Sequence, residues 1–459
     1  MADDDRSKLP SVRGLVARLR LSTGTAVPTS SFGRARRTAA AAIRTGAGVL
    51  AGRFRGLDVA GLAGADPKTI EQLVLSLGEL KGIAMKVGQI LSYIDDTLPE
   101  ETRQLLSLLQ VHSQPTAFSE IEAILREDFG PRADALLATI ERTPIASASV
   151  GQVHRARLAD GTDVAVKVRH PGIESAIAAD FRSAQIGRVL VGLLAPGSNV
   201  DQVAAEAKAR FLEECDYAVE QRHQRRFGTL FANDASINVP AVHPEWSSGR
   251  VLTTTWQDGR GLDSFVEHAT QAERDRAGRA LYEFYIGTLY RHGLFNADPH
   301  PGNLLFRDDR RIAVLDHGCV REFDSETVAA IIALSRAVRK EDDTGMREAL
   351  QLLGAKDPKP GPELEATREL MRGFYAPILG SGKRRLKAGV NLETRNVMKS
   401  KRDMLRLRIP GRLLFLFRIR FGLYSVLARL GAELDWQALE IELANQFRKL
   451  TPSAGVTSS

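Results

Sequence analysis

The chain has 459 residues, of which 43% are hydrophobic, so it can bury a sizeable core, and its length suggests two or three structural units. Its 63 basic and 56 acidic residues give a net charge of +7, which permits contact with nucleic acid or anionic lipid without distinguishing them. Its two cysteines, 104 positions apart, form neither a zinc pattern nor a disulfide framework, and they fit a reducing compartment.

The chain shows no signal-peptide pattern near Met1 and no apolar run as long as a transmembrane helix. The best candidate, 413–430, contains Arg418, Arg420 and Arg429, so we expect a buried or interfacial helix there. We therefore expect a cytoplasmic protein whose basic surface is compatible with peripheral contact at the inner face of a membrane.

The N-terminal part divides into a basic segment, 1–65, and a helical segment, 66–140. The first is rich in Ser, Thr, Arg and Ala, and we expect it to be mobile. Apolar residues at helical period predict a helix over 68–93, in which Lys86 and Gln89 are three positions apart and share a face. Two polar residues on one face usually indicate solvated surface. Two shorter helices are expected near 100–110 and 118–129.

A β-rich segment follows, over 141–258. The runs IERTPIAS, GQVHRARL and DVAVKVRH predict three strands, with Asp160-Gly161 supplying a tight turn. Lys167 lies in the third strand, as does the kinase lysine that binds the α- and β-phosphates. The first turn contains only small side chains, which let backbone N–H groups approach phosphate, although Ala and Ser adopt positive φ less readily than Gly. It comprises Ala146, Ser147, Ala148 and Ser149. An exposed edge lysine and an ordinary strand connection are the alternatives.

The charged run 201–228 predicts a helix that carries three acids, Glu214, Asp216 and Glu220. Asp216 and Glu220 are four positions apart and would share a face of an unbroken helix. We expect Glu220 to pair with Lys167. The strand 251–259 then leads to a hinge, where backbone groups near 255–257 would bind adenine.

The stretch 295–318, FNADPHPGNLLFRDDRRIAVLDHG, contains two aspartates and an asparagine at set intervals. Asp298 precedes Asn303 by five positions, as in the kinase catalytic loop, and Asn303 precedes Asp316 by thirteen. Between them, LLF and IAVL predict a short hairpin that can hold Asn303 and Asp316 on one metal. Two carboxylates and an amide suit Mg²⁺. A surface loop is the alternative for turn-forming residues, but the two matching intervals favour the metal site.

Six motifs occur in the order found in the UbiB/AarF-type atypical kinases, the coenzyme Q-associated kinase-like proteins, which the chain resembles over about 68–340. They are KxGQ at Lys86–Gln89, the Ala-rich loop, VAVK, ExD at Glu214–Asp216, DPHPGN and Asp-His-Gly. The resemblance implies an α+β, bilobal protein-kinase-like fold with a small β-rich N-lobe, 141–258, and a helical C-lobe, 259–450. The helical KxGQ extension, 66–140, precedes the N-lobe, and a disordered tail, 451–459, ends the chain.

The resemblance also implies ATP and Mg²⁺ as cofactors, and an ATPase or a small-molecule or lipid kinase linked to isoprenoid quinone metabolism. Asp298, Lys167 and Glu220 would be catalytic, and Asn303 and Asp316 would hold the metal. Nucleotide would contact the Ala-rich loop and Lys167, with Lys86 and Gln89 closing the site and Glu214 and Asp216 facing it. In this family, the Ala-rich loop is associated with altered nucleotide preference and with weak or absent protein phosphorylation.

The chain departs from the family and from ordinary kinases at several positions. Gln221 and His223 replace the usual Ala and Asn, and Asn296 stands where most members place a His, which we expect to change local support and not the chemistry. No Ala-Pro-Glu motif follows Gly318, so no peptide-docking platform is visible. The alternatives are a Ser/Thr protein kinase and a pseudokinase-like scaffold that binds nucleotide or lipid. Nucleic-acid binding would rest on charge alone and is not expected.

Overall fold

The computed structural model describes residues 115–147, 150–182, 212–386 and 411–447. The predicted helix over 68–93, with Lys86 and Gln89, lies outside these residues, as do Ala148, Ser149 and the first part of the predicted helix 201–228. The chain forms two compact units, Met1–Val219 with Val242–Trp256 and Glu220–Ala241 with Gln257–Ser459. The domain boundaries expected from the sequence stay predictions.

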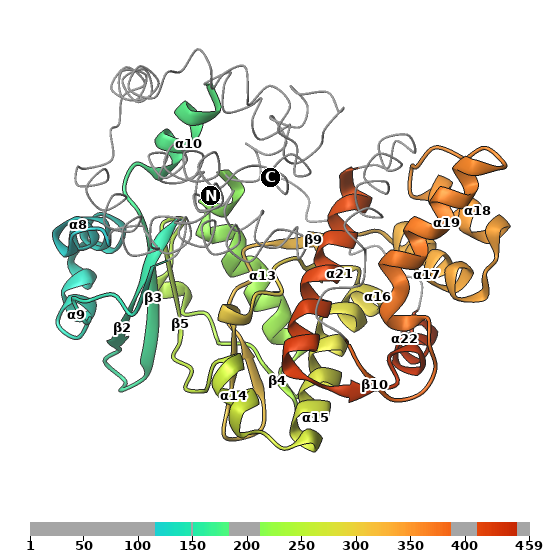
Figure 1. Cartoon of the computed structure of the whole chain (residues 1–459). Helices are drawn as coiled ribbons and strands as arrows, with labels where there is room; N and C mark the ends of the chain where they lie inside the picture. Colours follow the sequence, from blue (N-terminus) through green and yellow to red (C-terminus); the bar gives the residue numbers. More distant parts are fainter. Residues whose placement is uncertain (1–114, 148–149, 183–211, 387–410, 448–459) are drawn as a thin grey trace, which may run out of the picture. The chain divides into compact units, whose positions relative to one another are not determined.

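The first unit contains a four-stranded antiparallel sheet in the order β1-β2-β3-β5 (Figure 1). The predicted strands are confirmed, and Gly161, in the turn between the second and third, has a φ of +87°. The strands are β1 (Ala146–Ser147), β2 (Gly151–Arg157), β3 (Asp163–Arg169) and β5 (Val251–Thr255).

One face of this sheet forms a core with the helices that precede it in sequence. Alternate residues of β3, Val164, Val166 and Val168, are fully buried in one cluster with Leu125 of α8 (Phe118–Phe129). The helix predicted over 118–129 is therefore confirmed. The remaining elements of the unit are η2 (Gly130–Arg132), α9 (Ala133–Leu137), α10 (Ile173–Arg182) and η3 (Pro244–Trp246).

The helix predicted over 201–228 is not continuous. The chain leaves helical conformation at Cys215 and Asp216, and α13 (Tyr217–Leu230) begins directly afterwards. The Ala218 N–H donates to Asp216 Oδ1 at 3.0 Å, so Asp216 satisfies a free donor at the start of α13. The prediction that Asp216 and Glu220 share a face of one unbroken helix was therefore wrong, because the aspartate caps the second helix.

The second unit places the predicted site on two small sheets beside a long helical run. The predicted hairpin is confirmed as β7 (Leu304–Phe306) and β8 (Ile312–Val314), with β4 (Ile237–Asn238) parallel to β8. β6 (Leu294–Asn296) pairs with β9 (Val320–Glu322), and η5 (Pro301–Asn303) precedes β7. The long helical run comprises α15 (Gln271–Tyr282), a π-helical turn η4 (Glu283–Gly287) and α16 (Thr288–His292).

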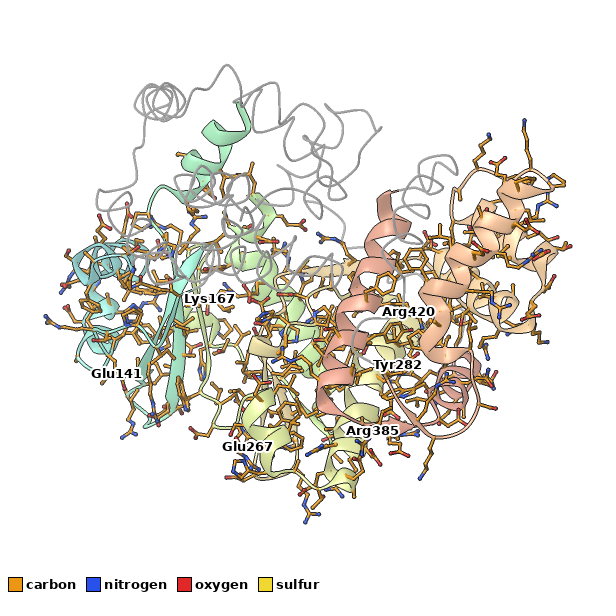
Figure 2. The ribbon with its side chains drawn as sticks, viewed as in Figure 1. Glu141, Lys167, Glu267, Tyr282, Arg385 and Arg420 are labelled. Atoms are coloured by element: carbon orange, nitrogen blue, oxygen red, sulfur yellow. The ribbon has the colours of Figure 1, made fainter. Side chains whose placement is uncertain are left out.

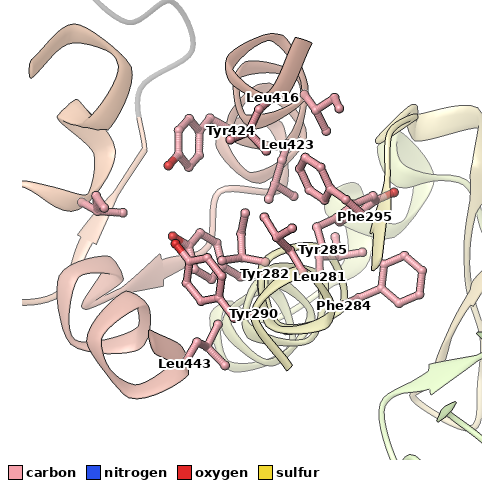
Figure 3. Close-up of a cluster of buried hydrophobic side chains, with 14 of the residues drawn as sticks. Leu281, Tyr282, Phe284, Tyr285, Tyr290, Phe295, Leu416, Leu423, Tyr424 and Leu443 are labelled. Atoms are coloured by element: carbon pink, nitrogen blue, oxygen red, sulfur yellow. The ribbon is translucent and has the colours of Figure 1, made fainter. Parts of the chain in front are cut away.

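Helices dominate the rest of the second unit. Buried apolar and aromatic residues from these helices meet in one cluster (Figure 3). No helix in the described ranges is both long enough and apolar enough to cross a membrane. The further elements are α14 (Leu262–His268), α17 (Ser325–Lys340), α18 (Asp343–Leu352), α19 (Pro362–Tyr375), η6 (Ala376–Ile378), β10 (Arg384–Arg385), α21 (Gly411–Leu430), β11 (Glu433–Leu434) and α22 (Trp436–Asn445).

A buried ion pair lies within this helical core, between Arg420 of α21 and Glu440 of α22. The two side chains are 2% and 0% exposed, and Arg420 Nη2 lies 2.9 Å from Glu440 Oε2. Glu440 also accepts hydrogen bonds from Tyr282, Tyr290 and Ser335 at 2.6, 2.6 and 2.7 Å (Figure 2 labels Tyr282 and Arg420). Burial opposes ionisation of Glu440, but Arg420 and these hydroxyls bring its pKa below the usual value.

Candidate active site

The loop after β6 brings Asp298 and Asn303 into direct contact. Asn303 Nδ2 donates to Asp298 Oδ2 at 2.9 Å, and both side chains are half-buried. The hairpin then returns the chain, because the Leu315 N–H donates to the Asn303 carbonyl at 2.9 Å. Asp316 directly follows Leu315, which is bonded to Asn303. The interval of thirteen positions between Asn303 and Asp316 therefore brings their backbones close together.

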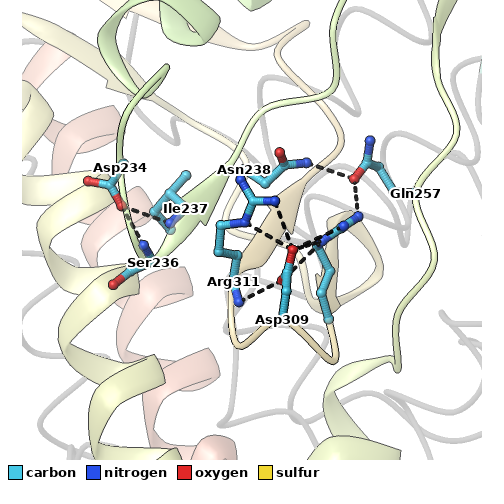
Figure 4. A network of polar contacts seen from close by, with 8 residues as sticks. Asp234, Ser236, Ile237, Asn238, Gln257, Asp309 and Arg311 are labelled. Atoms are coloured by element: carbon cyan, nitrogen blue, oxygen red, sulfur yellow. Dashed lines mark hydrogen bonds and ion pairs between the residues drawn. The ribbon is translucent and has the colours of Figure 1, made fainter.

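The tip of the hairpin is fixed by a polar network (Figure 4). Asp309 accepts from the Arg311 backbone at 3.0 Å and pairs with the Arg307 and Arg311 side chains, and these bonds hold its pKa well below the usual value. Arg307 Nη1 and Asn238 Nδ2 both donate to Gln257 Oε1, at 2.6 and 2.7 Å. The hairpin is thus tied at its tip to the segment that follows β5.

Two carboxylates converge on the backbone of Gly318. The Gly318 N–H donates to Asp316 Oδ1 at 2.8 Å, which closes a tight turn over the Asp-His-Gly motif. A Cβ at Gly318 would lie 3.3 Å from Asp316 Oδ1 and 3.4 Å from Glu220 Oε2, and Glu220 is only 4% exposed. One oxygen of each carboxylate therefore approaches the same point beside Gly318, and carboxylates that share a site favour a nearby cation.

His317 takes the place of the phenylalanine found in most kinases and packs as an aromatic ring. It is fully buried, with its ring centroid 5.0 Å from that of Phe227 in α13 and 6.4 Å from that of Phe284 in η4. The Asp316 backbone is therefore anchored to the helices of the second unit through the next side chain.

Two buried polar residues beside the aspartates had no assigned role in the site. Asn296, 1% exposed, is hydrogen-bonded to the backbone of both Asp298 and Asp316. Tyr285 lies in the π-helical turn, and its buried hydroxyl has no hydrogen-bond partner among the described residues. Burial, and then the carboxylates of Asp298 and Asp316, raise the pKa of Tyr285 well above the usual value. A tyrosine in an apolar helix is ordinary core, so the sequence held no signal for it.

In the first unit, Lys167 lies near the middle of β3, opposite Val153 of β2 and Leu252 of β5. Its Nζ is 5.0 Å from the ring centroid of Tyr217, which is fully buried. Ala146 and Ser147 are exposed in β1. Lys167 and Glu220 belong to different units, so their pairing stays a prediction, as do the roles of Glu214 and Asp216.

The model of the ABC1 atypical kinase-like domain matches residues 108–350, which is more than half of the chain. The chain belongs to the ABC1 atypical kinase-like family. The predicted family is confirmed, and so is the α+β kinase-like fold.

Named members of the ABC1 family and one solved structure are similar to this chain. Mouse AarF domain-containing protein kinase 1 is 29% identical over 69% of this chain and 61% of its own length. The atypical kinase COQ8, mitochondrial, of Saccharomyces cerevisiae is 27% identical over 62% of this chain and 57% of its own. A structure of a Mycobacterium tuberculosis protein, Rv3197, in complex with erythromycin has a TM-score of 0.58 and 28% identity, covering 82% of this chain and 95% of that one. The chain spans little more than half the length of the first curated relatives it matches.

The donor atoms of this ABC1 domain fit a hard cation. The Asn303 amide nitrogen is committed to Asp298, which leaves the amide oxygen as its ligating atom, and Asp316 supplies a carboxylate. Among the residues that the structure describes, no three His, Cys, Asp or Glu side chains gather as a metal site. A cation here would therefore depend on Asp316, on Asn303 and on phosphate oxygens, which is the usual way that proteins bind Mg²⁺.

Gly151 is required for the packing around Lys167, and we expect Gly151→Ala to destabilise the protein by roughly 1–3 kcal/mol. A Cβ at this position would collide with the Tyr217 hydroxyl and with the Val168 carbonyl, and the second is backbone that no rotamer change relieves. Urea unfolding measures the loss.

Gly228→Ala is the matched control for Gly151→Ala. A Cβ at Gly228 meets nothing within 4 Å, and the residue lies inside helix α13. Alanine there should be neutral, or should stabilise by about 0.5–1 kcal/mol. Equal stability of the two alanine variants would contradict the proposed packing of Tyr217.

Proposed function

We propose that this chain binds ATP with Mg²⁺ and either hydrolyses it or phosphorylates a small molecule or lipid, in support of isoprenoid quinone metabolism. The observation that carries the proposal is the 2.9 Å bond between Asn303 and Asp298, with the hairpin returning the chain to Asp316. The relatives named as kinases support ATP use, and the resemblance to the coenzyme Q-associated kinase-like proteins supports the link to quinones.

The proposed roles follow from phosphoryl transfer, in which positioning and charge neutralisation supply most of the rate. Lys167 would bind the α- and β-phosphates, with Glu220 orienting it. Asp298 would orient the acceptor hydroxyl or water and accept its proton. Asn303 and Asp316 would hold Mg²⁺, which when bound neutralises charge on the phosphates. The backbone around Ala146–Ser149 would contact phosphate, and Lys86 and Gln89 would close the site. Glu214 and Asp216 would face the KxGQ segment and the metal region.

The segment after Gly318 favours a small acceptor over a protein. Only residues 319–324 separate Gly318 from α17, and β9 occupies three of them. Ordinary protein kinases place a long activation segment in this part of the chain, where it helps to bind the peptide substrate. A lipid or quinone-like acceptor, reached by peripheral contact of a cytoplasmic protein with a membrane, fits the short connection and the net charge of +7.

The test is phosphate release by the full chain with Mg-ATP, measured alone, with anionic liposomes and with a phenolic quinone-like additive. Omission of Mg²⁺ is the control for metal dependence. We expect Mg²⁺-dependent release that rises with liposomes or with the additive, because either would present the acceptor or order the site.

Two other outcomes would assign a different function. Phosphorylation of proteins at a rate that exceeds phosphate release would identify a protein kinase. Thermal stabilisation by ATP without any phosphate release would identify a pseudokinase-like scaffold.

A further inference from the structure

Asn296 is a buried polar residue at the end of β6. It is 1% exposed and lies opposite Val320 of β9 in the strand pair. Immediately after it, the Ala297 N–H donates to the Cys319 carbonyl at 2.6 Å, so the two segments stay paired beyond the strands. The side chain of Asn296 therefore lies at one end of the β6–β9 pair. At this end the loop containing Asp298 follows β6, and the Asp-His-Gly motif leads into β9.

Both polar atoms of the Asn296 side chain are used, and both bond to backbone groups of aspartates. Asn296 Oδ1 accepts from the Asp298 N–H at 3.0 Å, and Asn296 Nδ2 donates to the Asp316 carbonyl at 2.9 Å. An amide is suited to this task because it carries an acceptor and a donor on one planar group. The two aspartates are eighteen positions apart in sequence, yet one side chain links their main chains.

We propose that Asn296 is a positioning residue that fixes the separation between the acceptor-orienting carboxylate of Asp298 and the metal-binding carboxylate of Asp316. The inference rests on the proposed function of this site. Each carboxylate can turn about its own side chain, but its Cα is held by the amide on one side and by the hairpin or the His317 ring on the other. Without the amide, the N–H of half-buried Asp298 and the carbonyl of half-buried Asp316 would lose their partner, and the two loops could separate.

A residue that merely fills space at this position would behave differently from one that sets the spacing. Asn296→Leu keeps the number and branching of the side-chain heavy atoms, with a larger volume, and removes both hydrogen bonds, whereas Asn296→Ala removes the bonds and the volume. Thr367→Ala is the control for loss of a buried hydrogen bond in the same unit, because Thr367 is fully buried and its hydroxyl donates to the Glu363 carbonyl at 2.7 Å, in α19.

The experiment measures the Mg²⁺ concentration that gives half-maximal thermal stabilisation with a non-hydrolysable ATP analogue, and kcat and KM for ATP turnover. Replacement of a residue that orients a metal ligand without touching the metal typically lowers metal affinity or activity by about 10- to 100-fold. We expect Asn296→Leu and Asn296→Ala to raise the required Mg²⁺ concentration and lower kcat within this range, with little change in KM. Thr367→Ala should lower the unfolding temperature and leave the Mg²⁺ requirement unchanged.

The outcomes separate this inference from the proposed function. Asn296 variants that lose stability as Thr367→Ala does, but keep the wild-type Mg²⁺ requirement and kcat, would overturn the positioning role alone. If Asn296→Leu does not fold, Asn296→Ala decides in the same way. A wild-type chain with neither Mg²⁺-dependent stabilisation nor turnover would overturn the proposed function, and this inference with it.

Discussion

Replacement of Asp316 by asparagine is expected to lower Mg-ATP turnover by at least about 100-fold, the usual effect of removing one group that stabilises developing charge. The substitution removes a negative charge and almost no volume. The turn over Asp-His-Gly should survive, because an asparagine oxygen can still accept the Gly318 N–H that Asp316 Oδ1 accepts at 2.8 Å. The loss should therefore appear in metal binding and kcat, with little change in the unfolding temperature.

Asp308→Asn is the matched control, since Asp308 is an exposed aspartate at the tip of the same hairpin. Phosphate release is measured for both variants over a range of Mg²⁺ concentrations, and thermal unfolding shows that both are folded. Unchanged turnover in Asp316→Asn would remove the metal assignment from this residue. A loss that excess Mg²⁺ fully restores would show that Asp316 contributes affinity and little else.

The loop that contains Asp298 and Asn303 could be predicted from the sequence because its contacts are local. Asp298 and Asn303 are five positions apart, and a short loop of turn-forming residues leaves few ways to place them except together. The return to Asp316 was predictable for a similar reason, since two short apolar runs around a polar tip predict a hairpin. These inferences needed only the spacing of residues along the chain.

The contacts of Asn296 could not be predicted in the same way. They depend on the pairing of β6 with β9, two three-residue strands whose register no periodic pattern marks. The sequence showed only an unusual residue where a His is common, and we expected a change of local support. The structure shows that this support consists of two hydrogen bonds, from the Asn296 side chain to the backbone of Asp298 and of Asp316.

The break before α13 was missed because one acidic residue can serve two purposes. Asp216 fitted a helix face four positions from Glu220, but an aspartate is also among the best residues to cap a helix start. No Gly or Pro marks the break at Cys215 and Asp216, so composition favoured a continuous helix. The bond from the Ala218 N–H shows that Asp216 caps the start of α13.

Arg420 was read from the sequence as an interruption of an apolar run, which excluded a transmembrane helix. In the structure it is the buried partner of Glu440, which lies on a different helix. Helical periodicity shows that a charge lies among apolar residues but not what faces it across the core. A buried arginine is acceptable only when a carboxylate meets it, and that partner is set by packing between α21 and α22.

Removal of one partner of this pair should be among the most destabilising single changes in the second unit. We expect Arg420→Met to lower the free energy of unfolding by about 3–5 kcal/mol, because Glu440 would stay buried without its compensating charge. The Arg420 guanidinium lies 4.9 Å from the ring centroid of Tyr375 and 6.0 Å from that of Tyr424, so the loss includes these cation–π contacts as well as the ion pair. Glu440→Leu should cost a similar amount, since Arg420 would then be the uncompensated ion.

The double variant, Arg420→Met with Glu440→Leu, distinguishes charge from packing. Replacing both members of a buried pair by apolar residues is often neutral or stabilising, so the double variant should recover most of the loss of either single change. Urea unfolding of the four proteins closes the cycle, with Arg429→Met, an exposed arginine in the same helix paired with Asp263, as the control. A double variant as unstable as the sum of the two single changes would show that the two charges are not coupled, and that the loss on replacing Glu440 comes from its bonds to the Tyr282, Tyr290 and Ser335 hydroxyls on other helices.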